Sequence, residues 1–410
     1  MLLLLLFFNI SVKEKGTKCP FVRLLDMKKK ERMKIYTLLF GILFVSPTQA
    51  QTMHDWENHH VLQINREPAR AAFTPFSVQK GDGSISLDGT WKFRWTPVPN
   101  ERVMNFYQTN FNDKDWTDFP VPANWEMNGY GTPIYVSAGY PFKIDPPRVM
   151  GEPKTDYTTY KERNPVGQYR RTFVLPAGWE ANGQTFLRFE GVMSAFYVWI
   201  NGERVGYSQG SMEPSEFNVT KYLKSGENQI SQEVYRYSDG SYLEDQDFWR
   251  FGGIHRSIHL IHTPDIHVRD YAVRTLPASA GDYEDFILQI DPQFSVYRGM
   301  TGKGYVLQGV LKDASGKEVA TLKGNVEDIL DLEHKASRMN EWYPQRGPRK
   351  MGRLSAIIKS PERWTAETPY LYKLHLTLQN GEGKVVEQIE QAVGFRSVEI
   401  KKGQLLVNGN

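Results

Sequence analysis

The sequence has almost no cysteine and no strong excess of charge. Cys19 is the only cysteine in 410 residues, so an internal disulfide is excluded. The formal net charge is +3, and no basic stripe interleaved with aromatic residues occurs, so nothing supports nucleic acid as a partner. Internal repeats, heptads and low-complexity segments are missing too. These absences leave an ordinary soluble globular protein of two or three domains.

Long apolar runs are missing outside the first 50 residues. The opening run MLLLLLFF meets charged residues well short of the roughly 20 residues that span a bilayer. From Met33 the chain reads MKIYTLLFGILFVSPTQA, which predicts a signal peptide over 33–50 with cleavage after Ala50. We interpret residues 1–32 as an upstream mis-start, with a true long leader as the alternative. The mature protein is therefore predicted to be exported, periplasmic or extracellular, and free of membrane segments.

Aromatic residues are abundant, at 13% of the chain with 10 tryptophans, and they sit in short alternating segments. In AFYVWINGERVGY, alternate residues must point to opposite faces of a strand, and Asn201-Gly202 suits a two-residue hairpin turn. Many such segments at close spacing predict an all-β fold. We expect a jelly-roll, galactose-binding-like sandwich over 51–264 and an immunoglobulin-like β-sandwich over 265–397. The last segment, 398–410, reads as one strand and a turn that are not completed.

The stretch between Pro120 and Pro165 is dense in Pro, Gly, Tyr and Asn and shows little periodicity. Loops of this length in compact domains are usually functional or disordered. Trp125 and Tyr130 in this stretch could stack on a sugar, but buried loop anchors are the more common role of such residues.

The stretch SDGSYLEDQDFWRFGGIHR places Glu244, Asp245 and Asp247 within four positions. Carboxylates this close raise each other's pKa unless something compensates them. A cation, an arginine such as Arg250, or a ligand rich in hydroxyls could do so. The alternative is a solvated acidic loop.

Several motifs together resemble the N-terminal portion of the β-galactosidases (lactases) of glycoside hydrolase family 2. They are, in chain order, DWENHHV, LDGTWKFRW, VPANWEMNGYGTPIY, GVMSAFYVWINGERVGYSQGSMEPSEFNVTKYL, GENQI, SDGSYLEDQDFWRFGGIHR, WTAETPYLY and VGFRSVEI. The resemblance runs from about residue 55 to the end. It implies a sugar-binding jelly roll, then an immunoglobulin-like sandwich, then a (β/α)8 catalytic barrel that begins near residue 398.

The resemblance implies retaining hydrolysis of terminal non-reducing β-D-galactose residues, a reaction that needs two carboxyls roughly 5 Å apart. The family carries both glutamates in the barrel, which takes about 250 residues. We therefore expect no catalytic residue in this chain and no activity from the chain alone. The alternatives are a β-glucuronidase or β-mannosidase of the same family, or a non-catalytic carbohydrate-binding module. β-Galactoside sugars are the expected partners, and the full-length enzyme is expected to be a homo-oligomer.

By resemblance, Asp247 touches the galactose and ligates Na+, since a hard cation prefers oxygen ligands. The family has an asparagine where this chain has Ser137, so the resemblance places Ser137 beside the sugar, with an ordinary loop serine as the alternative. The resemblance also implies a Mg2+ site made only of oxygen ligands. Its members are Asp55, Asn58, Val61 through its carbonyl, Gln209 and Asp239. Asp-Gly and Asn are also ordinary turn residues.

Overall fold

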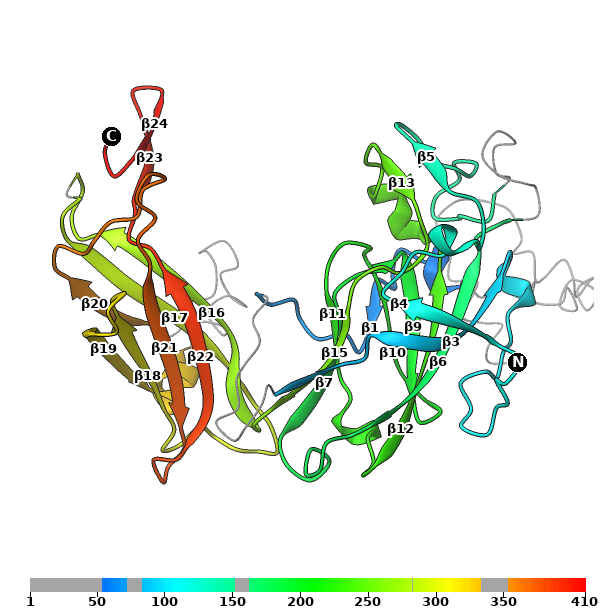
Figure 1. Cartoon of the computed structure of the whole chain (residues 1–410), viewed down its shortest axis with the longest axis horizontal. Helices are drawn as coiled ribbons and strands as arrows, with labels where there is room; N and C mark the ends of the chain where they lie inside the picture. The colour runs from blue at the N-terminus through cyan, green and yellow to red at the C-terminus, as the bar shows by residue number, and fades with distance from the viewer. Residues whose placement is uncertain (1–53, 72–82, 152–161, 282, 333–352) are drawn as a thin grey trace, which may run out of the picture. The chain divides into compact units, whose positions relative to one another are not determined.

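The computed structural model describes residues 54–71, 83–151, 162–281, 283–332 and 353–410 (Figure 1). The predicted leader and signal peptide lie outside these residues. No helix among the described residues is long and apolar enough to cross a membrane. In the described part of the chain the regular structure is almost entirely strand, with short 3-10 turns and helical residues at 326–332, so the predicted all-β class is confirmed.

Two sheets form the first sandwich. The larger has the order β1 (Gln63–Ile64), β10 (Glu203–Gln209), β9 (Ala195–Ile200), β12 (Glu227–Tyr235), β6 (Val166–Val174), β3 (Gly89–Thr96) and β4 (Thr117–Val121). The smaller has the order β11 (Ser215–Asn218), β7 (Gln184–Phe189), β15 (Ile258–Thr263) and β2 (Ser84–Ser86). Neighbouring strands that are distant in sequence, such as β12 and β6, give the crossed connections of a jelly roll.

The β9–β10 hairpin confirms the alternation that the sequence predicts. Asn201 and Gly202 form its turn with φ of 51° and 87°, the left-handed values that a two-residue hairpin requires. Phe196 and Val198 enter the core between the two sheets. Tyr197 and Trp199 point the other way into a second, mainly aromatic cluster. The large sheet is therefore buried on both faces.

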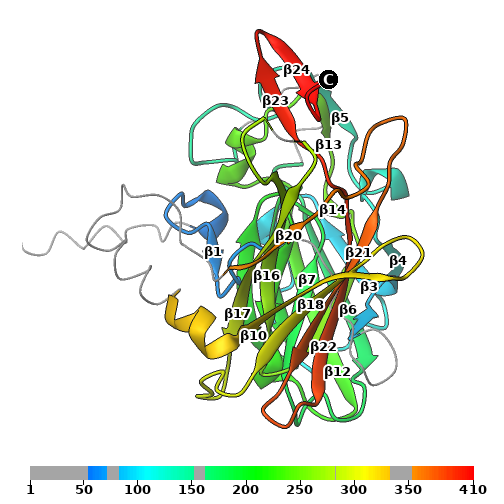
Figure 2. The same cartoon turned by 90° about the vertical axis from the view of Figure 1, so that its left-hand side faces the viewer.

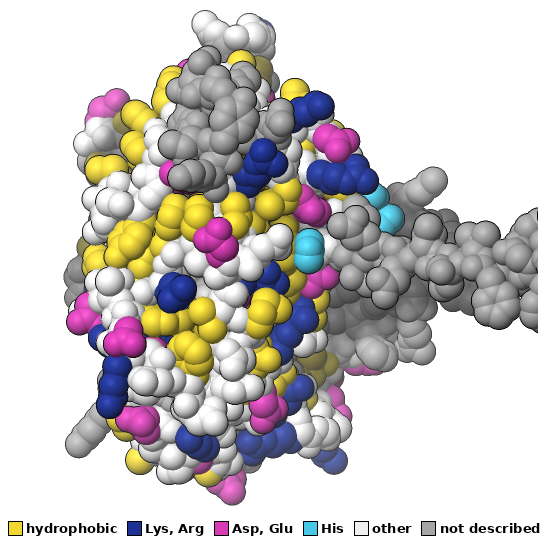
Figure 3. Space-filling view, turned by 90° about the vertical axis from the view of Figure 1, so that its right-hand side faces the viewer, with side chains coloured by type: hydrophobic (Ala, Val, Ile, Leu, Met, Phe, Trp, Pro, Cys, Tyr) yellow, Lys and Arg dark blue, Asp and Glu magenta, His cyan; other side chains and the backbone are white. Residues whose placement is uncertain are grey.

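The outer aromatic cluster explains the irregular stretch after Pro120. Phe142 and Val149 are buried in this cluster beside Trp56 and Tyr235, whose rings stack at 4.0 Å. The described part of the long segment is thus packed against the large sheet. Figure 3 shows one face of the molecule, where hydrophobic patches alternate with side chains of both charges.

The second sandwich pairs a three-stranded and a four-stranded sheet (Figure 2). The first has the order β16 (Ile266–Pro277), β17 (Phe286–Val296) and β20 (Leu354–Ile358). The second has the order β19 (Glu318–Asn325), β18 (Val306–Lys312), β21 (Tyr372–Gln379) and β22 (Val385–Val393). Alternate residues of both sheets, such as Leu288 and Leu376, form one buried core, as in an immunoglobulin-like fold.

The expectation of an unfinished strand and turn after residue 397 is wrong. β23 (Val398–Lys401) and β24 (Gln404–Val407) form a complete antiparallel hairpin (Figure 2). Its turn residues, Lys402 and Gly403, have φ of 53° and 76°. The sequence predicts the strand and the turn, but not the second strand that completes the hairpin, since lysine is an unusual residue at such a turn position.

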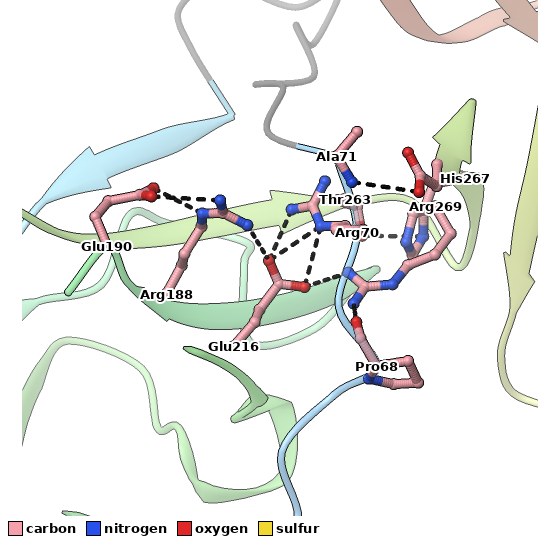
Figure 4. A network of polar contacts seen from close by, with 10 residues as sticks. Pro68, Arg70, Ala71, Arg188, Glu190, Glu216, Thr263, His267 and Arg269 are labelled. Atoms are coloured by element: carbon pink, nitrogen blue, oxygen red, sulfur yellow. Dashed lines mark hydrogen bonds and ion pairs between the residues drawn. The ribbon is translucent and has the colours of Figure 1, made fainter. Parts of the chain in front are cut away.

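Glu216 on β11 is the centre of a buried ion-pair network (Figure 4). Arg70 lies 2.8 Å away, Arg188 lies 3.5 Å away, and Arg269 on β16 also pairs with it. Burial alone would raise the pKa of Glu216, but Arg70 and Arg269 outweigh it and lower the pKa below its usual value. Glu216 therefore stays charged among its arginines.

Glu387 on β22 supports the backbone beside Arg269. The β16–β17 pairing shifts register between Val268 and Asp270, so that Arg269 has no partner residue on β17. The Val268 amide donates to Glu387 Oε2 at 2.8 Å. Glu387 Oε1 has no hydrogen-bond partner among the described residues, and burial raises the pKa of this carboxyl to about 8.

This raised pKa predicts a stability that falls with rising pH. Between its unfolded value of 4.5 and about 8, the folded protein keeps the Glu387 proton and the unfolded chain releases it. Each pH unit in that window should therefore lower the free energy of unfolding by up to about 1.4 kcal/mol. Glu387→Gln should flatten this slope in urea unfolding at pH 5 and pH 8. Glu390→Gln, an exposed residue of the same strand, should keep the slope, and equal slopes in both variants would contradict the account.

Candidate functional site

A short antiparallel ribbon carries the two residues predicted to touch sugar. β5 (Ile134–Val136) pairs with β13 (Phe248–Arg250), which opposes Val136 to Phe248 and Tyr135 to Trp249 (Figure 1). Ser137 directly follows β5 and Asp247 directly precedes β13. Continuing the register places these two residues opposite each other at the end of the β5–β13 ribbon. Both are exposed.

The three carboxylates of the acidic stretch have separate partners. Tyr135 donates its hydroxyl hydrogen to Asp247, and this hydrogen bond raises the pKa of the tyrosine. Asp245 pairs with Arg250 at 3.0 Å and accepts from the Gly139 amide at 3.2 Å.

The remaining acid, Glu244, accepts from the amide and hydroxyl of Ser211 at 2.7 and 2.6 Å. The sequence suggests a cation, an arginine or a ligand to compensate the three carboxylates. The structure shows the arginine, because Arg250 pairs with Asp245. Asp247 retains lone pairs for other donors, since only the Tyr135 bond to its side chain occurs among the described residues.

A buried ion pair fixes both strands of the ribbon. Arg236, which follows β12, donates to the carbonyls of Thr132, two residues before β5, and of Arg250, the last residue of β13, at 2.8 and 2.5 Å. Its Nε lies 3.2 Å from Glu126 Oε1, and both side chains are 1% exposed. Burial raises the pKa of Glu126, while Arg236 and the Gly252 amide, which donates at 3.0 Å, limit the rise.

The ring of Trp125 packs against Gly252 and Gly253, the two glycines that follow the ribbon, and leaves no room for a larger side chain at Gly252. A Cβ on Gly252 would lie 2.4 Å from the Trp125 ring, and Gly253 has a φ of 115°. Trp125 is fully buried and donates its indole N–H to Tyr169. Tyr130 packs edge-on against Phe93 at 5.1 Å. Both aromatic residues therefore anchor the loop, and the full burial of Trp125 rules out the sugar-stacking alternative for that residue.

The residues predicted to hold Mg2+ also gather in one place. Gln209 donates to the Val61 carbonyl at 3.2 Å and accepts from the Gly240 amide at 3.1 Å, next to Asp239. Asp239 Oδ1 is buried without a hydrogen-bond partner among the described residues. Burial raises the pKa of Asp239, and hydrogen bonds from Gln209 and nearby amides oppose the rise.

Asp55 approaches the same place from η2 (Asp55–Glu57), which contacts η6 (Asp239–Leu243), the turn that bears Asp239. It accepts from the Tyr197 hydroxyl at 2.7 Å. Burial raises the pKa of Tyr207, and the nearby carboxylates of Asp239 and Asp55 raise it further. Asn58 follows η2 directly and accepts from the His60 amide at 3.2 Å.

The five predicted ligands fit an oxygen-coordinated cation. Two carboxylates, two side-chain amides and one backbone carbonyl make a donor set suited to Mg2+. The unpartnered, buried oxygen of Asp239 is the feature that an ion would satisfy. Among the described residues, no group of three or more His, Cys, Asp or Glu side chains is close enough to bind a metal.

A pocket of about 400 Å³ is lined by all three residues of β13, including Trp249. Gln209, Ser211, Glu244, Phe248 and Arg250 are among its lining residues, whereas Asp247 and Ser137 are not. The sequence reasoning missed Glu126 and Arg236, which position the ribbon. No sequence motif predicts this role, since the partners of Arg236 are mostly backbone carbonyls, which any residue type supplies.

The geometry describes a β-sandwich with one exposed ribbon flanked by carboxylates, and comparisons with protein families identify its class. The family model "Glycosyl hydrolases family 2, sugar binding domain" matches residues 85–264, and the model "Glycosyl hydrolases family 2" matches residues 266–396. The chain belongs to glycosyl hydrolases family 2 and comprises its N-terminal sugar-binding and immunoglobulin-like domains.

Two curated relatives that the chain matches are β-galactosidases. The chain is 37% identical over 369 residues to that of Priestia megaterium (strain DSM 319 / IMG 1521), covering 87% of this chain and 33% of the relative. It is 35% identical over 371 residues to that of Pectobacterium atrosepticum, covering 87% of this chain and 32% of the relative. The chain thus spans about a third of these proteins' length.

Solved structures share the fold at lower identity. A β-glycosidase from Bacteroides vulgatus has a TM-score of 0.57 at 20% identity, covering 80% of this chain and 36% of its own. Bacteroides uniformis β-glucuronidase has a TM-score of 0.58 at 22% identity, covering 80% and 34%.

Removing Arg236 should loosen the ribbon. Arg236→Met leaves Glu126 buried without its counter-charge and leaves two carbonyls without a donor, so it should destabilise the first sandwich by about 3–5 kcal/mol. Amide hydrogen exchange should speed up at residues 134–136 and 248–250 beyond the change elsewhere in the sandwich. Lys92→Met, which breaks an exposed pair with Asp118 at 2.8 Å, is the control. Unchanged protection of the ribbon in Arg236→Met would contradict the role of the pair.

Proposed function

We propose that this chain is the non-catalytic N-terminal part of a β-galactosidase that hydrolyses terminal non-reducing β-D-galactosides with retention. The observation that carries the proposal is the 35–37% identity to curated β-galactosidases over 87% of the chain. The similarity to a β-glucuronidase, at 22%, speaks for the fold alone. The narrower lactase activity is part of the proposal.

Asp247 and Ser137 are the proposed contribution of this chain to the galactose site. The register of the β5–β13 ribbon, which sets them opposite each other, supports a joint role. An exposed carboxylate accepts hydrogen bonds from sugar hydroxyls, and the shorter serine can donate or accept one. Asp247 would also ligate Na+, which requires oxygen ligands such as its carboxylate.

We further propose that the protein is exported through the signal peptide over 33–50 and that the full-length enzyme is a homo-oligomer. The basic start, apolar core and small residues before Gln51 support export. The resemblance to the family is the support for the assembly.

Activity assays separate this proposal from its alternatives. The purified 410-residue chain should show no turnover of a chromogenic β-galactoside, because it carries no catalytic barrel. The protein obtained by following the reading frame past codon 410 should prefer the β-galactoside over the matching β-glucuronide and β-mannoside. In that protein, Asp247→Asn should lower kcat/KM about a hundredfold or more, since a charged contact at the site is lost.

The matched control is Asp118→Asn, which alters an exposed carboxylate of β4. It should leave kcat/KM unchanged. Turnover by the 410-residue chain, a preference for the glucuronide, or equal effects of the two substitutions would each contradict the proposal.

The proposed Mg2+ site predicts a metal-dependent melting temperature. Ion binding to the folded state alone stabilises it by mass action, so Mg2+ at about a hundredfold excess over Kd should add about 2.7 kcal/mol. Asp239→Asn should remove this gain, since it replaces the carboxylate that bears the unpartnered oxygen. Asp118→Asn should retain it. A thermal-shift titration with Mg2+ measures both, and an equal gain in the two variants would contradict the site.

A further inference from the structure

The β5–β13 ribbon has two distinct sides. Directly opposed residues of an antiparallel pair point to the same side, and residues alternate along each strand. The opposed pair Tyr135–Trp249 therefore shares its side with the pair Ser137–Asp247, because each residue of one pair lies two positions along the chain from a residue of the other. The pair Val136–Phe248 points to the other side, where Val136 is buried and Phe248 remains exposed.

The contacts on the Asp247 side agree with this alternation. Tyr135 reaches Asp247 with its hydroxyl and meets the Trp249 ring edge-on, with centroids 5.5 Å apart. The rings of Trp249 and Phe251 are parallel within 3°, with centroids 5.7 Å apart. Trp249 nevertheless remains 45% exposed. A flat aromatic surface thus lies beside a carboxylate and two hydroxyl-bearing side chains.

This combination matches the surface of a pyranoside. A β-galactoside has a patch of C–H groups on one face of its ring and hydroxyl groups around the rim. The C–H face packs on the electron-rich face of an aromatic ring, and the hydroxyls donate to a carboxylate. A large exposed indole is otherwise costly, since it leaves apolar surface in water.

We propose that Trp249 is a sugar-stacking residue that, together with Asp247, determines specificity for β-galactosides. The proposal rests on the proposed function. Asp247 fixes the hydroxyl edge of the sugar, and Trp249 packs against the C–H face of its ring, so that the two contacts together fix which hydroxyl meets the carboxylate. Tyr135 holds both, because it donates to Asp247 and packs against Trp249. It is therefore a positioning residue.

The test uses the 410-residue chain labelled with 5-fluorotryptophan. The fluorine signal of Trp249, assigned with Trp249→Phe, is followed during titration with methyl β-D-galactopyranoside and, separately, with methyl β-D-glucuronide. Dissociation constants of the variants come from saturation-transfer difference spectra of the sugar. Phe248→Ala is the matched control, because Phe248 is the adjacent residue, is 41% exposed and points to the opposite side.

We expect the Trp249 signal to shift saturably with the galactoside. Trp249→Ala should weaken binding about three- to tenfold, the usual contribution of one aromatic contact, and Phe248→Ala should not. No shift of the Trp249 signal, or equal weakening by the two substitutions, would overturn the inference. The proposed function is tested separately by turnover and would survive that result. A shift with the glucuronide alone would overturn both the galactoside specificity of Trp249 and the proposed function.

Discussion

The buried ion pair between Arg236 and Glu126 is the interaction on which the candidate site depends. Neither side chain can reach water, and taking two charges out of water costs several kcal/mol each. The cost is offset by the attraction between the two charges and by the hydrogen bonds that each side chain makes to the backbone. Arg236 binds one carbonyl just before β5 and one at the end of β13, and Glu126 binds the Gly252 amide. The pair therefore specifies where the ribbon lies as well as holding it to the sandwich.

The ribbon needs this help because it is short. β5 and β13 have three residues each, and their own ladder could not hold them in place in water. Trp125 supports the same connection from the hydrophobic side, since only glycine fits against it at 252. A polar and an apolar anchor thus converge on the turn after β13. The side chains of Asp247 and Trp249 can then stay exposed without the ribbon losing its shape.

Sequence reasoning succeeded where a local rule decides the structure. The β9–β10 hairpin follows from alternation and from Asn201-Gly202, and both sandwiches follow from the density of such segments. It failed where partners are distant or are backbone atoms. The pairing of Tyr135 with Trp249 joins strands more than a hundred residues apart, and the alternation in the acidic stretch is too short to reveal it. No motif in the sequence indicates the role of Arg236. The hairpin turn at Lys402-Gly403 has a lysine where asparagine, aspartate or glycine is usual.

A double-mutant cycle on Glu126→Gln and Arg236→Met tests the central role of the buried pair most directly. The free energies of unfolding of the native chain, both single variants and the double variant give the coupling between the two side chains. A coupling of at least about 2 kcal/mol, with the double variant little worse than Arg236→Met alone, is the predicted result. Additive losses would contradict the account, because the two residues would then stabilise the sandwich independently and would not act together on the ribbon.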